Sequence, residues 1–361
     1  MRINKKIWLA AGIVLFTFYF FFAARPIPFE TVLTPRWIHS LNSNAPIILE
    51  AKDQNEKHSV TAFTLGNQFG FISNNGKLLF NKEKNNNISL SPDFWSEYEA
   101  QPDRITVYEN DGRILVEIDD PLGYPFFIDN RIFIINSEQN AVQEIDFSGK
   151  VLWSYDFACQ IICADAASGL FLAGTLDGEI CVLDNNGRRI FSFEPGGSRY
   201  SVIAGCAISA NGNDIAIIAG LDSQRFLHLK RSGTAQYKVV YHEFLESGFS
   251  RPVLINFIQN DQWVVFECYG GLGFYQVDSR KTEKVSLNGK INSIDNRGGM
   301  GLVFTVISPA ENRKELIGIQ LPDNIMLRAS FKSVDFFLDR IDSRLITGGE
   351  NTLIAFDLER R

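Results

Sequence analysis

The sequence predicts an all-β fold, an eight-bladed β-propeller of four-stranded antiparallel blades preceded by one N-terminal transmembrane helix. Three observations predict the propeller. A hairpin with a glycine-containing turn recurs at intervals of 36, 37, 38 and 46 residues, two further short strands precede most copies, and no stretch after Thr31 has the pattern of a long amphipathic helix. With 361 residues the chain is long enough for one large domain of this kind.

The N-terminus predicts a membrane anchor. Residues 1–6 form a basic stub, MRINKK, and residues 7–24 contain no charged side chain. Such a segment is just long enough to cross a bilayer as a helix, and Phe22 stands where a cleavable signal peptide would have a small residue. We therefore expect an uncleaved, single-pass signal anchor in the inner membrane, with a cytoplasmic N-terminus and a periplasmic body. A linker would follow over residues 25–30, and cleavage after Ala24 is the alternative.

Glycines mark the turns of the repeated hairpins. Each lies between two short runs of alternating apolar residues, as in FGFISNNGKLLFN and VQEIDFSGKVLWSY, a pattern typical of β-hairpins with Gly- and Asn-rich turns. Later copies around Asp278 and Pro322 lose the glycine but keep the same shape. The turn glycines are Gly76, Gly112, Gly149, Gly187 and Gly233.

The two ends of the chain are expected to share one blade. The last hairpin, TLIAFDLERR, stops before its outer strand, whereas residues 31–41 carry Trp37 in a context similar to LWSYDF of an earlier copy. An open ring would leave an unpaired strand edge. We therefore expect a propeller over residues 31–361, closed by strand 31–41 pairing with strand 353–358. Seven blades are the alternative, because residues 84–118 form a poor set of strands.

Two segments resemble the repeat of pyrroloquinoline-quinone-type (PQQ-like) β-propellers, namely DFSGKVLWSY and LAGTLDGEICVLDNNGRRIFSF. In that family, a Trp on the outer strand docks against the neighbouring blade. The resemblance implies that Trp153 docks blades, with Phe191 and Trp37 in equivalent places and no chemical role for any of them. WD40-like propellers are similar, but no repeat here carries their Gly-His and Trp-Asp pairs.

The chain is also similar in repeat type, blade number and size to the propeller lipoproteins of the outer-membrane β-barrel assembly machinery. It departs from them at the anchor, because no Cys follows the apolar N-terminal run. This resemblance implies a protein-binding role in the cell envelope, with the partner left open.

Charge and motifs argue against nucleic-acid binding and against familiar catalytic sites. The formal net charge of the chain is -7. Residues 1–25 contain four basic residues and no acid, so residues 26–361 carry a net charge of -11 and lack the positive charge of a nucleic-acid-binding surface. The five Cys fit no zinc or redox spacing, there is no adjacent Cys pair of the quinone enzymes, and GxSxG and phosphate-loop motifs are absent. His228 and His242 share one predicted hairpin but lack a third ligand. We expect no catalytic residue, cofactor or metal; an enzyme whose site converges from several loops is the alternative.

The predicted contact surface is built from loops. Turns between second and third strands share one face with the blade-to-blade connections, and exposed loops commonly carry recognition. On that face we expect Tyr and Phe side chains and Arg, the types that dominate interface hot spots, to bind an envelope protein. The protein would then be a non-catalytic interaction scaffold, with a ligand-binding or sensory propeller as the alternative. The candidate residues are Tyr124, Phe126, Arg199, Tyr200, Phe249, Arg251 and Tyr269. The alternative for each of the aromatic residues is that its side chain packs inward on the core of a blade and does not contact a partner.

Overall fold

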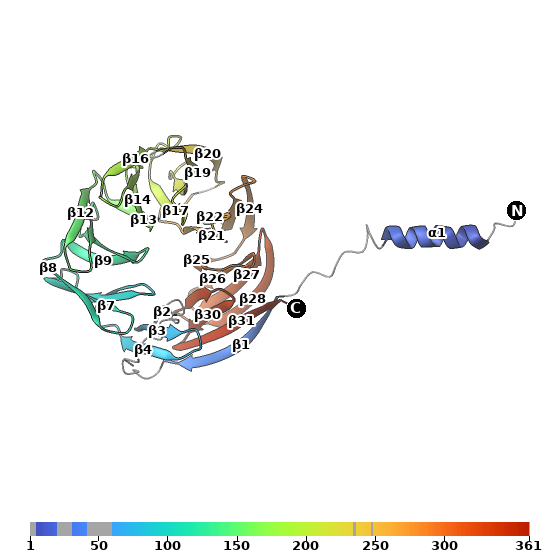
Figure 1. Ribbon diagram of the computed structural model, residues 1–361, viewed down its shortest axis with the longest axis horizontal. Coiled ribbons are helices and arrows are strands. Elements are labelled where there is room, and N and C mark those ends of the chain that lie inside the picture. Colours follow the sequence, from blue (N-terminus) through green and yellow to red (C-terminus); the bar gives the residue numbers. More distant parts are fainter. Residues whose placement is uncertain (1–4, 20–30, 42–59, 234–235, 247, 361) are drawn as a thin grey trace. The chain divides into compact units, whose positions relative to one another are not determined.

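A computed structural model describes residues 5–19, 31–41, 60–233, 236–246 and 248–360 of the chain. Within them, eight antiparallel sheets follow one another around a ring (Figure 1). Seven of these sheets have four described strands and one has three. The predicted eight-bladed, all-β propeller is therefore confirmed, and the seven-bladed alternative is wrong. Blades are numbered 1 to 8 in chain order below.

The strands of each blade run antiparallel from the inside of the ring to its rim. Blade 1 contains β2 (Val60–Leu65), β3 (Gln68–Ser73) and β4 (Leu78–Glu83); blade 2 contains β5 (Asn87–Leu90), β6 (Phe94–Tyr98), β7 (Arg104–Glu109) and β8 (Ile114–Asp119). Blade 3 contains β9 (Gly123–Ile128), β10 (Arg131–Asn136), β11 (Ala141–Ile145) and β12 (Val151–Asp156); blade 4 contains β13 (Ile161–Ala167), β14 (Leu170–Thr175), β15 (Ile180–Leu183) and β16 (Arg189–Phe193).

The second half of the ring repeats this order. Blade 5 contains β17 (Ile203–Ile208), β18 (Asp214–Ala219), β19 (Arg225–Arg231) and β20 (Tyr237–Phe244); blade 6 contains β21 (Ile255–Ile258), β22 (Trp263–Cys268), β23 (Gly271–Gln276) and β24 (Lys281–Ser286). Blade 7 contains β25 (Lys290–Ile294), β26 (Leu302–Ala310), β27 (Arg313–Gln320) and β28 (Asn324–Lys332); blade 8 contains β29 (Phe337–Ile341), β30 (Arg344–Gly349), β31 (Thr352–Arg360) and β1 (Thr31–Ser40).

One helix precedes the strands. This helix, α1, runs over Lys5–Phe18 and contains the first part of the predicted anchor. Residues 20–24 of the predicted span and the predicted linker at 25–30 lie outside the described residues. In the described part of the chain, no helix is long and apolar enough to cross a membrane.

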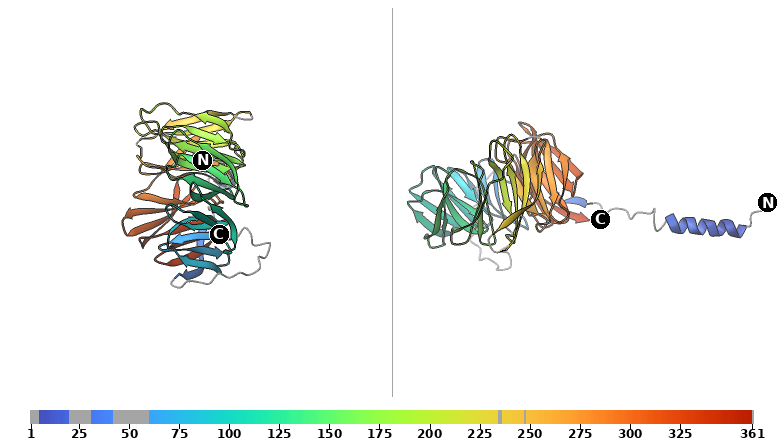
Figure 2. Two further views of the ribbon diagram at one scale, coloured as in Figure 1. Left: turned by 90° about the vertical axis from the view of Figure 1, so that its left-hand side faces the viewer. Right: turned by 90° about the horizontal axis from the view of Figure 1, so that it is seen from above.

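The core lies between neighbouring sheets, which the side views show packed side by side (Figure 2). Leu172 of β14 and Ile217 of β18, for example, belong to one apolar cluster shared by blades 4 and 5. Middle strands are covered on both faces, so they read as continuous apolar runs, and all six residues of β18 are buried. Outer strands cover a neighbour with one face only, so exposed and buried residues alternate along them, as in β12.

Aromatic side chains of outer strands contact the next blade. Trp153 of β12 lies against Gly187, where an added Cβ would come within 2.7 Å of the indole side chain. Trp37 of β1 covers Gly76 in the same way, with 2.5 Å between such a Cβ and the ring. Both glycines have a positive φ, so a side chain there would be strained as well as blocked. Phe191 of β16 contacts the ring of Tyr237 in blade 5 at 5.2 Å.

Strands from the two ends of the chain share blade 8, in which the order is β1-β31-β30-β29. Leu41, fully buried, donates its backbone N–H to the carbonyl of Asn351 at 2.8 Å. Asp357 of β31 accepts from Arg344 at 2.6 Å and pairs with Arg36 of β1 at 3.4 Å. The outermost place of this blade is thus occupied by β1.

Candidate functional site

The antiparallel order divides the loops between two faces. One face, called here the connection face, carries the turns between second and third strands and the connections between blades. The other, called the turn face, carries the first-to-second and third-to-fourth turns. Five of the seven predicted contact residues belong to the connection face of blades 5 and 6: Arg199, Tyr200, Phe249, Arg251 and Tyr269. We call these five residues the blade 5–6 surface.

Arg251 organises the connection between β20 and β21. Its guanidinium binds both carboxylate oxygens of Glu267 on β22, with Nη2–Oε1 at 2.5 Å and Nη1–Oε2 at 3.0 Å. Glu267 is buried, and a buried carboxylate needs such a partner. The ring of Phe249 lies 4.4 Å from Arg251 Cζ, and Tyr269 lies 6.3 Å beyond Phe249. Phe249 is half-buried against the apolar cluster of blades 5 and 6, and Tyr269 is exposed above it.

A buried glutamine braces the same connection from blade 5. Gln224 Nε2 donates to the carbonyl oxygens of Gly220 at 3.2 Å and Phe249 at 3.4 Å, while its Oε1 accepts from the Phe249 N–H at 3.4 Å. Because Gln224 has almost no solvent exposure, these bonds satisfy groups that would otherwise be costly to bury. The backbone at Phe249 is consequently held in place rather than free to rearrange.

The connection between β16 and β17 carries the remaining pair. Arg199 binds Asp222 at 3.1 Å and its Cζ lies 5.9 Å from the ring of Tyr200, which is 60% exposed. Ser198 also donates its hydroxyl to Asp222. The Ser198 hydroxyl and the Arg199 guanidinium together lower the pKa of the Asp222 carboxyl, which is a stable anion at neutral pH.

The two connections adjoin. The N–H of Leu221 donates to the Tyr200 carbonyl at 3.2 Å, and Gly248 packs against the Leu221 carbonyl so closely that a Cβ would lie 3.0 Å from its oxygen. The backbones that carry Tyr200 and Phe249 are thus linked through Leu221. The structure therefore brings the five residues of the blade 5–6 surface into one contiguous area.

Tyr124 and Phe126 lie elsewhere, on β9 of blade 3. Phe126 points inward and stacks on Phe133 at 5.3 Å, as part of an apolar cluster shared by blades 3 and 4. Tyr124 accepts a hydrogen bond from Gln139 at 3.1 Å and stacks at 6.3 Å on Tyr98. These two residues are not brought together with the other five, and Phe126 has the packing role that was the structural alternative.

A pocket of about 210 Å³ opens beside the blade 5–6 surface, between β20 and blade 6. Phe244, Glu243 and Glu246 line it from blade 5, and Tyr269 and Lys284 from blade 6. Cys268 also lines the pocket, but burial raises its pKa to about 11, so its thiol is protonated and a poor nucleophile at neutral pH.

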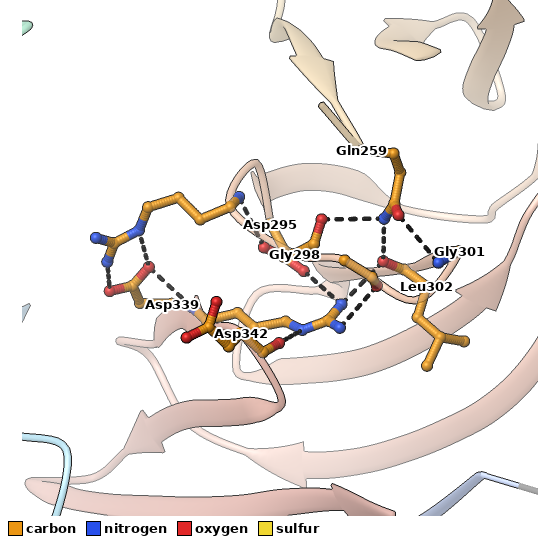
Figure 3. Close-up of polar contacts among 10 residues, drawn as sticks. Gln259, Asp295, Gly298, Gly301, Leu302, Asp339 and Asp342 are labelled. Carbon is orange, nitrogen blue, oxygen red and sulfur yellow. Dashed lines mark hydrogen bonds and ion pairs between the residues drawn. The ribbon is translucent and has the colours of Figure 1, made fainter. Parts of the chain in front are cut away.

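A buried polar network lies at the turn face (Figure 3). Arg340 of β29 is fully buried and donates four hydrogen bonds. The acceptors are Asp295 Oδ2 at 3.2 Å and the backbone carbonyl oxygens of Leu302, Gly299 and Asp342 at 2.9, 2.8 and 2.9 Å. Since Asp295 and Leu302 belong to blade 7, these bonds fasten blade 8 to its neighbour.

The same network extends to blade 6. Gln259 donates from Nε2 to the carbonyl oxygens of Gly298 and Leu302, both at 3.1 Å, so it bridges blades 6 and 7 (Figure 3). Arg297 binds the carboxylate of Asp339, again across blades 7 and 8. The polar groups of this network are hydrogen-bonded to one another within the fold. We therefore assign the network to the docking of blades and not to catalysis or ligand binding.

His228 and His242 do not meet. His228 of β19 is buried between Asp214 at 2.8 Å and the hydroxyl of Tyr275 at 3.0 Å, whereas His242 of β20 is exposed. Cross-strand pairing places His228 opposite Tyr241, which puts His242 on the opposite side of the sheet. Among the described residues, no three His, Cys, Asp or Glu side chains are placed to hold a metal ion.

Sequence reasoning missed the residues that position the surface. Glu267 was the available signal, because a lone acid inside the apolar run WVVFEC indicates a buried, paired carboxylate. Gln224, Asp222 and the pocket residue Glu243 carry no comparable signal, since polar residues near strand ends are usually solvated.

Comparisons with known proteins agree with this architecture. A family model described as "beta-propeller protein" matches residues 1–360. An uncharacterized protein of Treponema pallidum (strain Nichols) is 26% identical over 369 residues, which cover 99% of this chain and 94% of that protein. The crystal structure of BamB from Moraxella catarrhalis superposes with a TM-score of 0.61 and 11% identity, covering 90% of this chain and all of that one. The last likeness shows a shared fold.

Proposed function

Because the chain belongs to this family of β-propeller proteins, we propose that it acts as a non-catalytic scaffold that binds an envelope protein through the blade 5–6 surface. The observation that carries the proposal is the contiguous, braced arrangement of exposed Tyr200 and Tyr269 with Arg199, Phe249 and Arg251. Tyr and Arg side chains in such positions are typical hot-spot residues. Loops held by buried partners lose little conformational freedom on binding, which favours affinity.

The cellular setting is the second part of the proposal. A basic stub followed by 18 uncharged residues supports a signal anchor with the propeller on the periplasmic side of the inner membrane. The test is protease treatment of intact cells and spheroplasts. The propeller should be digested only in spheroplasts, and digestion solely from the cytoplasmic side would overturn the topology.

Partner binding is tested by crosslinking in the native envelope followed by purification of the tagged full chain. The triple variant Arg199→Ala, Tyr200→Ala, Tyr269→Ala truncates two exposed rings and one exposed arginine. It should lose a stoichiometric protein partner that the wild type retains, with an unchanged melting temperature. Phe147→Ala is the matched control, since this exposed aromatic lies in a third-to-fourth-strand turn on the turn face. Equal recovery of the partner with wild type and triple variant would refute the assignment.

A ligand-binding propeller is the second candidate, favoured by one observation. An apolar pocket of about 310 Å³ lies between blades 7 and 8, lined among others by Leu316, Phe331 and Phe356. Its volume is at the lower end of the roughly 300–1,000 Å³ of small-molecule sites. A small molecule that stays bound in native mass spectrometry of the envelope-purified chain, without a protein partner, would favour this function over the scaffold.

A further inference from the structure

The pocket beside the blade 5–6 surface has the size of a site for one side chain. Its volume of about 210 Å³ is below the roughly 300–1,000 Å³ of small-molecule sites. Phe244 and Tyr269 are large aromatic residues in its lining, and they are 60% and 58% exposed. Aromatic side chains in such positions offer flat faces to a partner group that enters the pocket.

The pocket also contains carboxylate oxygens with unused hydrogen-bonding capacity. Glu243 accepts from the hydroxyls of Thr282 at 2.6 Å and Tyr241 at 3.0 Å, two neutral donors. A carboxylate has about four acceptor sites, so about two remain. Among the residues that the structure describes, no cation is paired with Glu243.

Glu246 adds a second acid at the mouth of the pocket. It is paired with Lys284 at 3.2 Å, but its side chain is 85% exposed. An exposed pair of this kind contributes little, so an incoming cation can compete for the carboxylate. The lining contains two acids and one ammonium group, and the guanidinium of Arg225 beside Phe244 offsets the remaining negative charge. The unused acceptor sites of Glu243 are therefore the feature that selects a hydrogen-bonding cation.

In the neighbouring loops, the cation that lies between an aromatic ring and a carboxylate is a guanidinium. Arg251 lies over Phe249 and binds Glu267, and Arg199 lies near Tyr200 and binds Asp222. In both cases a guanidinium combines one aromatic face with one carboxylate. A third arginine, Arg225, lies 5.3 Å from the ring of Phe244 itself.

We propose that the pocket between β20 and blade 6 binds an arginine side chain of the partner protein, with its guanidinium bonded to Glu243 and stacked between Phe244 and Tyr269. A guanidinium is planar, stacks on aromatic rings and binds carboxylates through two parallel N–H groups, whereas an ammonium is a compact, strongly hydrated charge. This inference rests on the proposed function, because it identifies the chemistry of the partner at that same surface.

The test uses the purified full chain and three soluble probes: N-acetyl-L-arginine methylamide and its lysine and citrulline counterparts. Dissociation constants are measured by ligand-observed NMR titration. The arginine probe should bind at least about tenfold more tightly than the neutral citrulline probe, and Glu243→Gln should weaken it at least about tenfold. Glu311→Gln, which changes an exposed acid in the turn between β26 and β27 of blade 7, away from the pocket, should bind like wild type.

Equal binding of the arginine and citrulline probes would overturn the inference, and so would unchanged arginine binding by Glu243→Gln. Tighter binding of the lysine probe than the arginine probe would also overturn it. If Glu243→Gln does not fold, Tyr269→Ala at its exposed position must weaken arginine binding instead. A partner captured through the blade 5–6 surface without arginine selectivity refutes this inference alone, whereas arginine selectivity without any captured partner refutes the scaffold proposal alone.

Discussion

Replacing Arg340 with Met tests the view that the buried network at the turn face holds blades 7 and 8 together. The change removes four hydrogen bonds and leaves the carboxylate of Asp295, buried with 1% exposure, without its cation. Removing one partner of a buried ion pair typically costs about 3–5 kcal/mol. We expect Arg340→Met to lower the free energy of unfolding by about that amount, a large part of the roughly 5–15 kcal/mol of an ordinary domain.

The defect should depend on pH in a defined direction. Burial raises the pKa of Asp295 to about 6 although Arg340 lowers it, so losing Arg340 must raise it further. The folded state then holds the proton more tightly than the unfolded chain, whose Asp pKa is about 3.9. Stability is therefore lost as pH rises from about 4 through the folded-state pKa of Asp295, and below about pH 4 only the cost of the lost hydrogen bonds remains. Arg340→Met should be closer to wild type at pH 4 than at pH 7.

Urea unfolding followed by tryptophan fluorescence measures these differences, provided the m-value stays constant. Asp295→Asn in the Arg340→Met background should restore at least about 1 kcal/mol at pH 7, because contacting residues couple. Arg104→Met is the control: its pair with Asp119 is exposed, so the variant should unfold at nearly the same urea concentration as the wild type. A loss below about 1 kcal/mol for Arg340→Met at pH 7, or a loss that does not vary with pH, would refute the reasoning.

Three further predictions concern the blades themselves. Gly187→Ala should destabilise by about 2–4 kcal/mol in urea unfolding, because it combines left-handed backbone strain with a clash against the docked tryptophan. Gly169→Ala would meet only Asn185 Cβ, at an ordinary contact distance of 3.9 Å, and should show the strain alone; equal losses would contradict this. Burial raises the pKa of Asp165 to about 6, so the free energy of unfolding of the wild type should fall by up to about 3 kcal/mol as the pH rises from about 4 to 6. Asp165→Asn should not show this fall, and parallel pH–stability curves for the two proteins would contradict the prediction. Burial raises the pKa values of Cys181 and Cys268 to about 12 and about 11. Both thiols should therefore react with a disulfide reagent at pH 8 only after unfolding, and fast labelling of either in the native chain would contradict this prediction.

The blade repeat was predictable because its signals are local. Turn glycines, alternating apolar residues and the recurring outer-strand aromatics are each set within about a dozen residues, and they led to eight blades. Residues 84–118 were the weak point, yet they form a complete blade 2. Although this segment is rich in polar residues, aromatic packing stabilises its strands: Trp95 is buried and stacks on Tyr108 at 4.2 Å. Such cross-strand contacts are invisible in a pattern of apolar and polar letters.

The candidate surface was predictable only as a list of residue types. Phe126 and Tyr200 were on the same list, but Phe126 packs half-buried against the apolar cluster of blades 3 and 4, whereas Tyr200 is exposed. Whether a loop aromatic points outward depends on the space that the neighbouring blade leaves, which no local pattern encodes. The same applies to Glu267, whose partner Arg251 lies 16 residues away in the chain.

The secondary structure, the repeat and the ring follow from local features of the sequence, because they depend on short-range periodicity and on turns that need particular residues. Tertiary structure alone decided which polar groups meet. Arg340 and Asp295 are 45 positions apart, and the carboxylates of the pocket come from a different blade than Tyr269. Inter-blade contacts join residues separated by about one repeat, so their geometry depends on how adjacent sheets dock, and that docking sets both the buried network and the proposed binding pocket.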